Sequence, residues 1–415
     1  MENYFGRMLT ASEIESDVHY ELQDGMREEG NFIICNRCES KHLKEEVALP
    51  IGAFYCPSCI ELGRIRSDES LYYLPQKLFE PKKACVWQGR LTAYQAEISV
   101  RLVTAAKEKD HLLVHAVTGA GKTEMMYAAV DEVIKQGGAV AIASPRIDVV
   151  KELEGRLRRD FSCPIACLYG GSESYKRSPL VIATTHQLLR FREAFDLVIV
   201  DEVDAFPYVD NPMLYQAVRG AQKKEAAVVY LTATSTKALE REVSAKRLAK
   251  VSLARRFHGN PLVVPQFRWQ SQFDASLCTQ RKSGYPLLIF APEIERGEAL
   301  AECLSKTYPE EKIGFVSAQT ADRLDIVEDF RTQSISILVT TTILERGVTF
   351  PKVDVFVNEA GHPNYTRSAL IQIAGRAGRS PERPTGLVTF FHTGKTGAMV
   401  DAVREINNMN QKGGF

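Results

Sequence analysis

The sequence predicts an α/β protein with two parallel-sheet domains in tandem and a small metal-binding module ahead of them. Three observations lead to this fold class. Short apolar runs recur along the chain with amphipathic stretches between them. This alternating pattern is interrupted once, and four closely spaced cysteines precede the first run. Unalternating apolar runs of strand length are typical of parallel strands buried on both faces, and the helical stretches between them complete βαβ units.

The composition is that of an ordinary globular protein of two or three domains. The chain has 415 residues, of which 45% are hydrophobic and 25% charged, and its formal net charge is zero. Bulk charge therefore does not indicate a nucleic-acid partner. No apolar run approaches the ~20 residues that span a bilayer, and the start lacks the basic and apolar regions of a signal peptide. We therefore expect a cytoplasmic location.

Changes in composition and in the pattern of apolar runs divide the chain into four ranges. Residues 1–86 form an N-terminal region with the cysteine module at 35–59, residues 87–255 the first α/β domain, residues 256–284 a linker, and residues 285–415 the second α/β domain. The apolar runs expected to form strands are residues 111–116, 139–143, 180–183, 197–200 and 228–231 in the first domain, and 287–290, 313–316, 335–339, 353–357 and 387–391 in the second.

The cysteine module holds two C-x-x-C pairs. Seventeen residues separate Cys35 and Cys38 from Cys56 and Cys59, which is the spacing of zinc sites with four thiolate ligands. Such a site is closed and structural, and zinc binding supplies most of the folding free energy of a fragment this small. A redox dithiol fits one C-x-x-C pair and fits two pairs in a short segment poorly. The module is therefore predicted to bind zinc.

A glycine-rich loop follows the first predicted strand. The strict phosphate-loop pattern has glycine where this chain has Ala116. Glycines let N–H groups turn onto phosphate oxygens, and the helix that follows adds its dipole. Lys122 is expected to reach the β- and γ-phosphates of ATP, and Thr123 to bind the magnesium ion. The residues of this loop expected to bind ATP are Thr118, Gly119, Ala120, Gly121, Lys122, Thr123 and Glu124.

An acidic pair closes the predicted strand at 197–200. The carboxyl ends of parallel strands are where ligands of such sheets bind. Asp201 is expected to bind the magnesium ion with ATP, and Glu202 to orient and deprotonate the attacking water. Upstream of the loop, Gln95 is expected to read the adenine edge with its amide.

A glutamine-to-arginine motif lies near the end of the second domain. Arg376 and Arg379 stand in a glycine-containing turn, and guanidinium forks suit the charge that develops on a transferring phosphoryl group. The loop and these arginines are too far apart for one small domain, so the nucleotide is expected to lie between two domains. The predicted catalytic residues are Lys122, Asp201, Glu202, Gln372, Arg376 and Arg379.

Polar residues end several predicted strands in both domains. Their hydroxyls and main-chain amides suit contact with a phosphate backbone, without readout of the bases. The residues expected to contact DNA are Arg146, Thr185, His186, Ser317 and Thr341.

With these motifs placed, residues 87 to 395 resemble the superfamily 2 helicases and translocases, which implies two RecA-like domains and ATP hydrolysis. Within that superfamily the chain looks most like the ComFA family of late-competence ATPases. Its short length, the cysteine module ahead of the motor and the run Arg255-Arg256-Phe257-His258-Gly259 point to that family. The superfamily motifs are Ser144-Pro145-Arg146, Asp201-Glu202-Val203-Asp204, Leu231-Thr232-Ala233-Thr234, Glu345-Arg346-Gly347 and the run from Gln372 to Arg379.

The resemblance to this family implies an ATPase, with magnesium and zinc, that is stimulated by single-stranded DNA and helps to pull transforming DNA into the cell. It also implies a peripheral position at the inner membrane face beside the DNA-uptake channel and a ComFC-like partner. The sequence itself is compatible with oligomerisation and leaves the oligomeric state open. Two alternatives stay open. One is a duplex-unwinding helicase of replication restart or repair, similar to PriA, and the other is an ATP-gated DNA-loading or scaffold protein.

Overall fold

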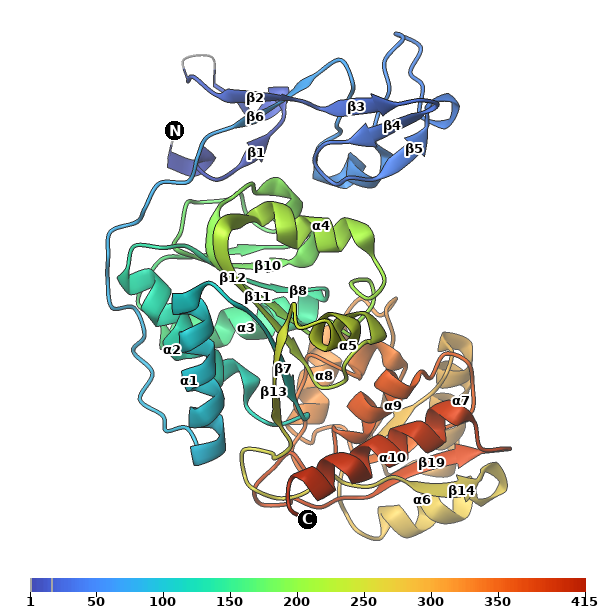
Figure 1. The fold of residues 1–415 in the computed structure, drawn as a ribbon. Helices are drawn as coiled ribbons and strands as arrows, with labels where there is room; N and C mark the ends of the chain where they lie inside the picture. The colour runs from blue at the N-terminus through green and yellow to red at the C-terminus, as the bar shows by residue number, and fades with distance from the viewer. Residues whose placement is uncertain (1, 16–17) are drawn as a thin grey trace. The chain divides into compact units, whose positions relative to one another are not determined.

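The computed structural model describes residues 2–15 and 18–415, which form two compact units (Figure 1). The first unit runs to His115 and resumes over Lys122–Ser252. The second unit comprises Ala116–Gly121 and Leu253–Phe415. Each unit is built on one large sheet, so the predicted tandem α/β architecture is confirmed.

Two small antiparallel sheets make up the N-terminal region, with strand orders β1-β6-β2 and β3-β4-β5. A hydrophobic cluster continues from Ile33 and the four cysteines to Leu188 and Phe191, so this region packs on the first α/β domain. The elements are η1 (Glu2–Tyr4), β1 (Met8–Leu9), η2 (Ala11–Glu13), β2 (Glu21–Asp24), β3 (Met26–Glu29), β4 (Phe32–Cys35), β5 (Lys41–Leu43), η3 (Lys44–Glu46), η4 (Pro57–Leu62) and β6 (Ser70–Tyr73).

The first large sheet has the order β13-β7-β12-β11-β8-β10-β9, and its pairs from β7 to β9 are parallel. All five predicted strands of this domain are present, and β9 and β13 were not predicted. The elements are α1 (Ala93–Glu108), β7 (His111–Ala116), α2 (Lys122–Lys135), β8 (Val140–Ser144), α3 (Ile147–Asp160), β9 (Ile165–Leu168), β10 (Leu180–Thr184), η5 (Thr185–Arg190), β11 (Phe195–Asp201), α4 (Pro212–Ala221), β12 (Gln222–Thr232), α5 (Lys237–Ser244) and β13 (Ala249–Leu253).

The second large sheet is parallel throughout, in the order β14-β19-β18-β15-β17-β16. All five predicted strands are again present. The elements are β14 (Gln266–Trp269), η6 (Gln270–Gln272), α6 (Phe273–Arg281), β15 (Leu287–Phe290), α7 (Ile294–Thr307), β16 (Ile313–Val316), α8 (Arg323–Arg331), β17 (Ile337–Thr340), η7 (Thr342–Leu344), β18 (Asp354–Val357), α9 (Arg367–Ala374), β19 (Val388–His392) and α10 (Gly397–Lys412).

The range 256–284, predicted as a linker, holds strand β14 and helix α6. β14 is an edge strand with partly exposed residues, so its sequence lacks the continuous apolar run of the central strands. β8, β10, β15, β17 and β18, by contrast, are buried at every position. Across residues 2–15 and 18–415, no helix is long and apolar enough to cross a membrane.

Candidate functional site

The predicted phosphate loop joins β7 to α2. Gly119 and Gly121 adopt φ angles of +77° and +74°, a left-handed conformation that glycine adopts without steric cost. Ala116, which stands where the strict pattern has glycine, is fully buried as the last residue of β7. The strand, loop and helix therefore follow one another as predicted, with Lys122 as the first residue of α2.

Lys122 and Asp201 meet at the carboxyl edge of the first sheet. Lys122 Nζ lies 3.9 Å from Asp201 Oδ1, and Asp201 is the last residue of β11. The chain then turns sharply, since Glu202 has a φ angle of +58° and its N–H donates to Asp201 Oδ1 at 2.9 Å. The sheet edge thus brings together an ammonium group and two consecutive acidic residues.

Arg156 on α3 holds the two residues that follow Lys122. Its Nη1 donates to Thr123 Oγ1 at 3.3 Å and lies 3.5 Å from Glu124 Oε1. The sequence reasoning missed Arg156, because it is one of several charged residues on an amphipathic helix and no local pattern distinguishes it.

Gln95 is a helix-capping residue in this structure. It lies in the first turn of α1, where its Oε1 accepts the Thr92 N–H at 2.9 Å and its own N–H donates to Thr92 Oγ1 at 3.3 Å. This reciprocal pair is a capping box, which satisfies two N–H groups at the start of the helix. Its expected role in reading adenine stays a prediction.

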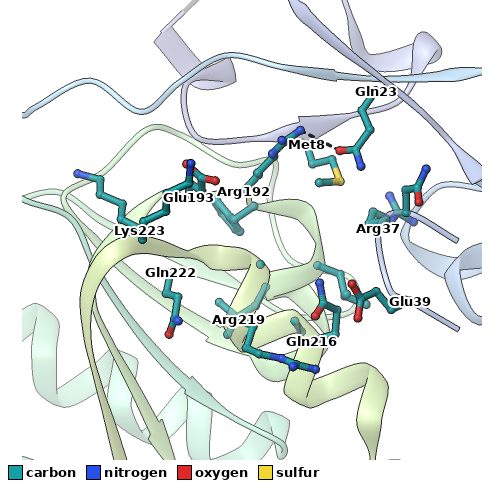
Figure 2. A pocket seen from close by; sticks show the side chains of 17 residues that line it. Met8, Gln23, Arg37, Glu39, Arg192, Glu193, Gln216, Arg219, Gln222 and Lys223 are labelled. Atoms are coloured by element: carbon teal, nitrogen blue, oxygen red, sulfur yellow. Dashed lines mark hydrogen bonds between the residues drawn. The ribbon is translucent and has the colours of Figure 1, made fainter. Parts of the chain in front are cut away.

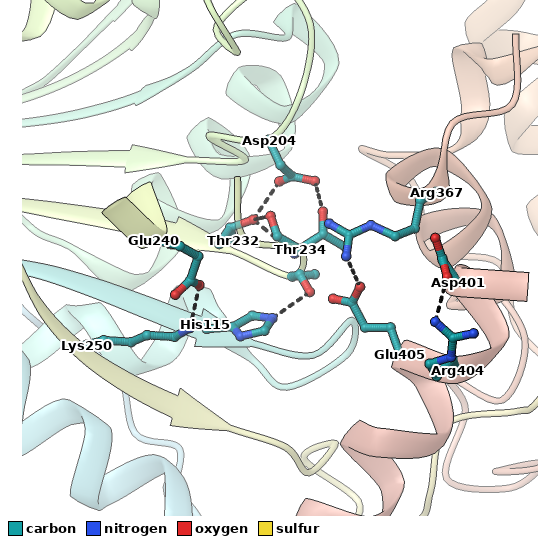
Figure 3. Close-up of polar contacts among 11 residues, drawn as sticks. His115, Asp204, Thr232, Thr234, Glu240, Lys250, Arg367, Asp401, Arg404 and Glu405 are labelled. Atoms are coloured by element: carbon teal, nitrogen blue, oxygen red, sulfur yellow. Dashed lines mark hydrogen bonds and ion pairs between the residues drawn. The ribbon is translucent and has the colours of Figure 1, made fainter. Parts of the chain in front are cut away.

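Asp204 connects the acidic motif to the Thr-Ala-Thr motif (Figure 3). Its carboxylate accepts hydrogen bonds from the hydroxyls of Thr232, at 2.7 Å, and Thr234. His115 Nε2 lies 3.1 Å from Ala233 O, at the end of β7. The ends of three consecutive sheet strands, β7, β12 and β11 with its following turn, are therefore tied together. Asp204 was not among the predicted site residues. The spacing of the two threonines, which lets both face one carboxylate, could have indicated that an acidic residue pairs with them.

We expect Asp204→Ala to lower the free energy of unfolding by about 1–3 kcal/mol, because the buried hydroxyls of Thr232 and Thr234 lose their carboxylate acceptor and Thr232 keeps only its bond to Thr234 O. Calorimetry of the variant and of Asp204→Ala combined with Thr232→Val measures the effect. The double variant should recover part of the loss, since removing both partners is less costly than removing one. An unchanged melting temperature in Asp204→Ala would contradict the assignment.

The glutamine-to-arginine motif lies in the second unit, on α9 and the turn that follows it. Gln372 is buried, and Arg376 is only 1% exposed, with its Nε donating to Glu345 O at 3.0 Å. Arg379 donates from Nε to Gly375 O at 3.0 Å and from Nη1 to Thr349 Oγ1 at 3.2 Å. The turn thus holds both guanidinium groups in defined positions, and their catalytic role stays a prediction.

The predicted DNA-contacting residues all follow parallel strands. Arg146 follows β8, Thr185 and His186 follow β10, Ser317 follows β16 and Thr341 follows β17. Thr185 and Ser317 are buried, with 0% and 2% of the residue exposed, so this structure presents neither of them for contact with a phosphate backbone. Burial lowers the pKa of His186, which favours the neutral imidazole. The DNA contacts stay predictions.

The four cysteines form one buried cluster with the geometry of a zinc site. Cys35 and Cys59 have their sulfur atoms 3.9 Å apart, Cys38 and Cys56 have theirs 3.6 Å apart, and all four sulfurs lie within 4.8 Å of one another. Zinc held tetrahedrally by sulfurs at about 2.3 Å needs sulfur separations of about 3.8 Å. The cluster therefore fits one zinc ion with four thiolate ligands.

Polar groups from three further residues face these sulfurs. The buried Arg37 donates from Nε to Cys59 Sγ at 3.4 Å, His42 Nε2 lies 3.6 Å from Cys56 Sγ, and Ser40 Oγ lies 3.2 Å from Cys38 Sγ. Donors around a metal site orient the ligands and offset thiolate charge. Arg37 lies inside the first C-x-x-C pair, so its position was available from the sequence but its direction was not.

A cavity of about 380 Å³ lies where the N-terminal region meets the first α/β domain (Figure 2). Arg192 crosses it, with Nη1 donating to Gln23 Oε1 at 2.8 Å. Basic residues outnumber acidic ones along its wall, and these charged residues are Arg37, Glu39, Arg192, Glu193, Arg219, Lys223 and Lys224. The boundary between the zinc module and this domain is therefore partly polar.

Two family models match the chain. The model described as helicase conserved C-terminal domain matches residues 271–381, and the model described as type III restriction enzyme, res subunit, matches residues 88–237. The structure of the Mycobacterium smegmatis helicase Lhr bound to ssDNA and AMP-PNP is similar in fold, with a TM-score of 0.58 at 19% identity, over 78% of this chain and 50% of that one. The two domains are thus RecA-like, and the chain is a helicase-type ATP hydrolase.

Two curated relatives match nearly the whole chain. Competence protein ComFA of Streptococcus pneumoniae (strain ATCC BAA-255 / R6) is 52% identical over 100% of this chain and 99% of its own length. Competence protein ComFA of Bacillus subtilis (strain 168) is 39% identical over 91% of this chain and 85% of its own length. The chain therefore belongs to the ComFA family of competence proteins.

Proposed function

We propose that the chain is an ATP-driven translocase on single-stranded DNA that acts in the uptake of transforming DNA. The observation that carries the proposal is the match to a competence protein over 100% of the chain, N-terminal region included. The geometry supports the motor part, because a phosphate loop, a lysine and an acidic pair lie together at one sheet edge.

The first unit is proposed to supply the side chains that bind ATP and activate water. In this proposal Lys122 binds the β- and γ-phosphates, and Thr123 and Asp201 supply the oxygen ligands that magnesium prefers. The N–H groups of the loop face the phosphates at the start of α2. Glu202, the residue after Asp201, is proposed to take a proton from the attacking water.

The second unit supplies the charge that stabilises the reaction. Arg379 and Arg376 are proposed to offset the negative charge that builds up on the transferring phosphoryl group, with Gln372 beside them. In this proposal the two arginines complete the site when the domains close, and this closure couples ATP hydrolysis to movement along DNA. The division into an N-terminal region and two motor domains belongs to the same proposal, with β14 and α6 of the range 256–284 assigned to the second domain.

The family resemblance also supports a ComFC-like partner and a peripheral position at the inner membrane face beside the uptake channel. The cysteine cluster is proposed to hold zinc as a structural ion. Helix η4 of the cysteine module packs against η5, which carries Thr185 and His186. The module therefore supports a segment that is proposed to lie near DNA.

The test is the rate of ATP hydrolysis with no polymer, with single-stranded DNA, with duplex DNA and with RNA. We expect single-stranded DNA to raise the rate most, with little separation of duplex strands in a parallel assay. Glu202→Gln, which should not hydrolyse ATP, controls for contaminating ATPases. Efficient unwinding of forked duplexes would favour the restart-type helicase instead, and a rate indifferent to every polymer would favour the loading or scaffold alternative.

A further inference from the structure

The segment of residues 253–258, here called the connecting segment, is bonded to the phosphate loop within the second unit. The N–H of Val117 donates to Leu253 O, and the N–H of Phe257 donates to Gly119 O, both at 3.0 Å. Two backbone bonds on either side of Thr118 therefore set the path of the loop against this segment.

The same segment is bonded to the turn that carries the two motif arginines. Arg256 Nη1 donates to the main-chain oxygens of Ala377, at 2.8 Å, and Gly378. His258 Nε2 donates to Gly378 O at 3.0 Å. Side chains of two connecting-segment residues thus hold the carbonyl groups between Arg376 and Arg379.

Arg256 is buried without a neutralising carboxylate. It is 2% exposed, and among the described residues no acidic side chain pairs with it. Burial, together with the nearby guanidinium of Arg379, lowers its pKa to about 9, so it stays charged at neutral pH. Its Nε has no hydrogen-bond partner within the described part of the chain. A buried charge held only by carbonyl dipoles is costly, so its retention here points to a role other than stabilising the fold.

Arg256 also touches the phosphate loop. A Cβ added to Gly119 would lie 3.7 Å from Arg256 Cδ and Cγ, so the stem of the arginine runs beside that glycine. The loop and the turn approach one another directly as well, because a Cβ at Gly375 would lie 2.2 Å from Thr118 Oγ1. The loop and the turn are therefore packed against one another.

We propose that Arg256 is a positioning residue that couples the phosphate loop to the arginine turn. Its stem follows Gly119, and its guanidinium fixes the carbonyls that set where Arg379 points. Occupation of the loop by a triphosphate then places the arginine for the reaction, while binding of the diphosphate needs no such placement. The proposal rests on the proposed roles of the loop and of Arg379.

The experiment is a double-mutant cycle of Arg256→Lys and Arg379→Ala on the full chain. Lysine keeps the charge but lacks the planar fork that reaches two carbonyls. We expect Arg256→Lys to lower kcat about tenfold to a hundredfold, as misplacement of a catalytic group does. Affinity for a fluorescent ADP analogue should be unchanged, and the double variant should be no slower than Arg379→Ala alone.

Arg255→Lys is the matched control, since the neighbouring Arg255 lies over the Phe415 ring and lysine keeps the positive charge that such a contact needs. His258→Ala, which removes one bond to the turn, should lower kcat in the same direction by less and serves if Arg256→Lys does not fold. Wild-type kcat in Arg256→Lys, or losses that multiply in the double variant, would overturn the coupling. Wild-type kcat in Arg379→Ala would instead overturn the proposed arginine assignment.

Discussion

Lys122→Ala is expected to abolish ATP hydrolysis while the protein stays folded. Removal of the ammonium group takes away the positive charge that lies 3.9 Å from Asp201 and, in our proposal, binds the β- and γ-phosphates. Loss of one group that stabilises charge in a transition state costs roughly 10²–10³ in kcat, and here the phosphates are bound less well besides. Release of inorganic phosphate, with and without single-stranded DNA, measures the effect.

Lys107→Ala on the neighbouring helix α1 is the matched control. Lys107 forms a partly exposed pair with Glu132 at 3.2 Å, and surface pairs of this kind contribute little to stability. Its hydrolysis rate should equal that of the wild type. If Lys122→Ala hydrolysed ATP at the wild-type rate, the nucleotide site would have to lie elsewhere in the chain.

The combined change Cys35→Ser and Cys38→Ser is expected to release zinc and unfold the module between Met26 and Arg66. Two of four ligands are lost, and structural zinc sites in isolated fingers contribute about 10–16 kcal/mol of apparent binding free energy at pH 7. Metal analysis should fall from one zinc per chain to none. Limited proteolysis should then cleave within the module, because its strands β3, β4 and β5 are short and depend on the cluster.

Cys278→Ser with Cys303→Ser is the matched control, because both cysteines are exposed and lie outside the cluster. Zinc content and proteolytic pattern should be those of the wild type. Absence of zinc from the intact wild-type protein would refute the metal assignment directly, whatever the variants show.

The sequence predicted the central strands of both large sheets and missed several of their edge strands. Central strands such as β8 and β15 are buried on both faces, so their apolar runs are continuous and easily recognised. Edge strands such as β9 and β14 are partly exposed and carry mixed residues, so no run marks them. The predicted linker therefore contained the start of the second sheet, because an exposed edge strand resembles a loop in composition.

By itself, the sequence determined the chemistry of the site: a phosphate loop ending in Lys122, an acidic pair after a buried strand, and four cysteines at zinc spacing. These follow from local residue order, since a loop, a strand end and two C-x-x-C pairs each lie within a few residues. Only the tertiary structure decided which distant groups support them. Arg156 at Thr123, Arg37 at Cys59 and Arg256 at the arginine turn are such groups. Their contacts join segments far apart in the chain, and side-chain direction across a fold is not encoded in local spacing.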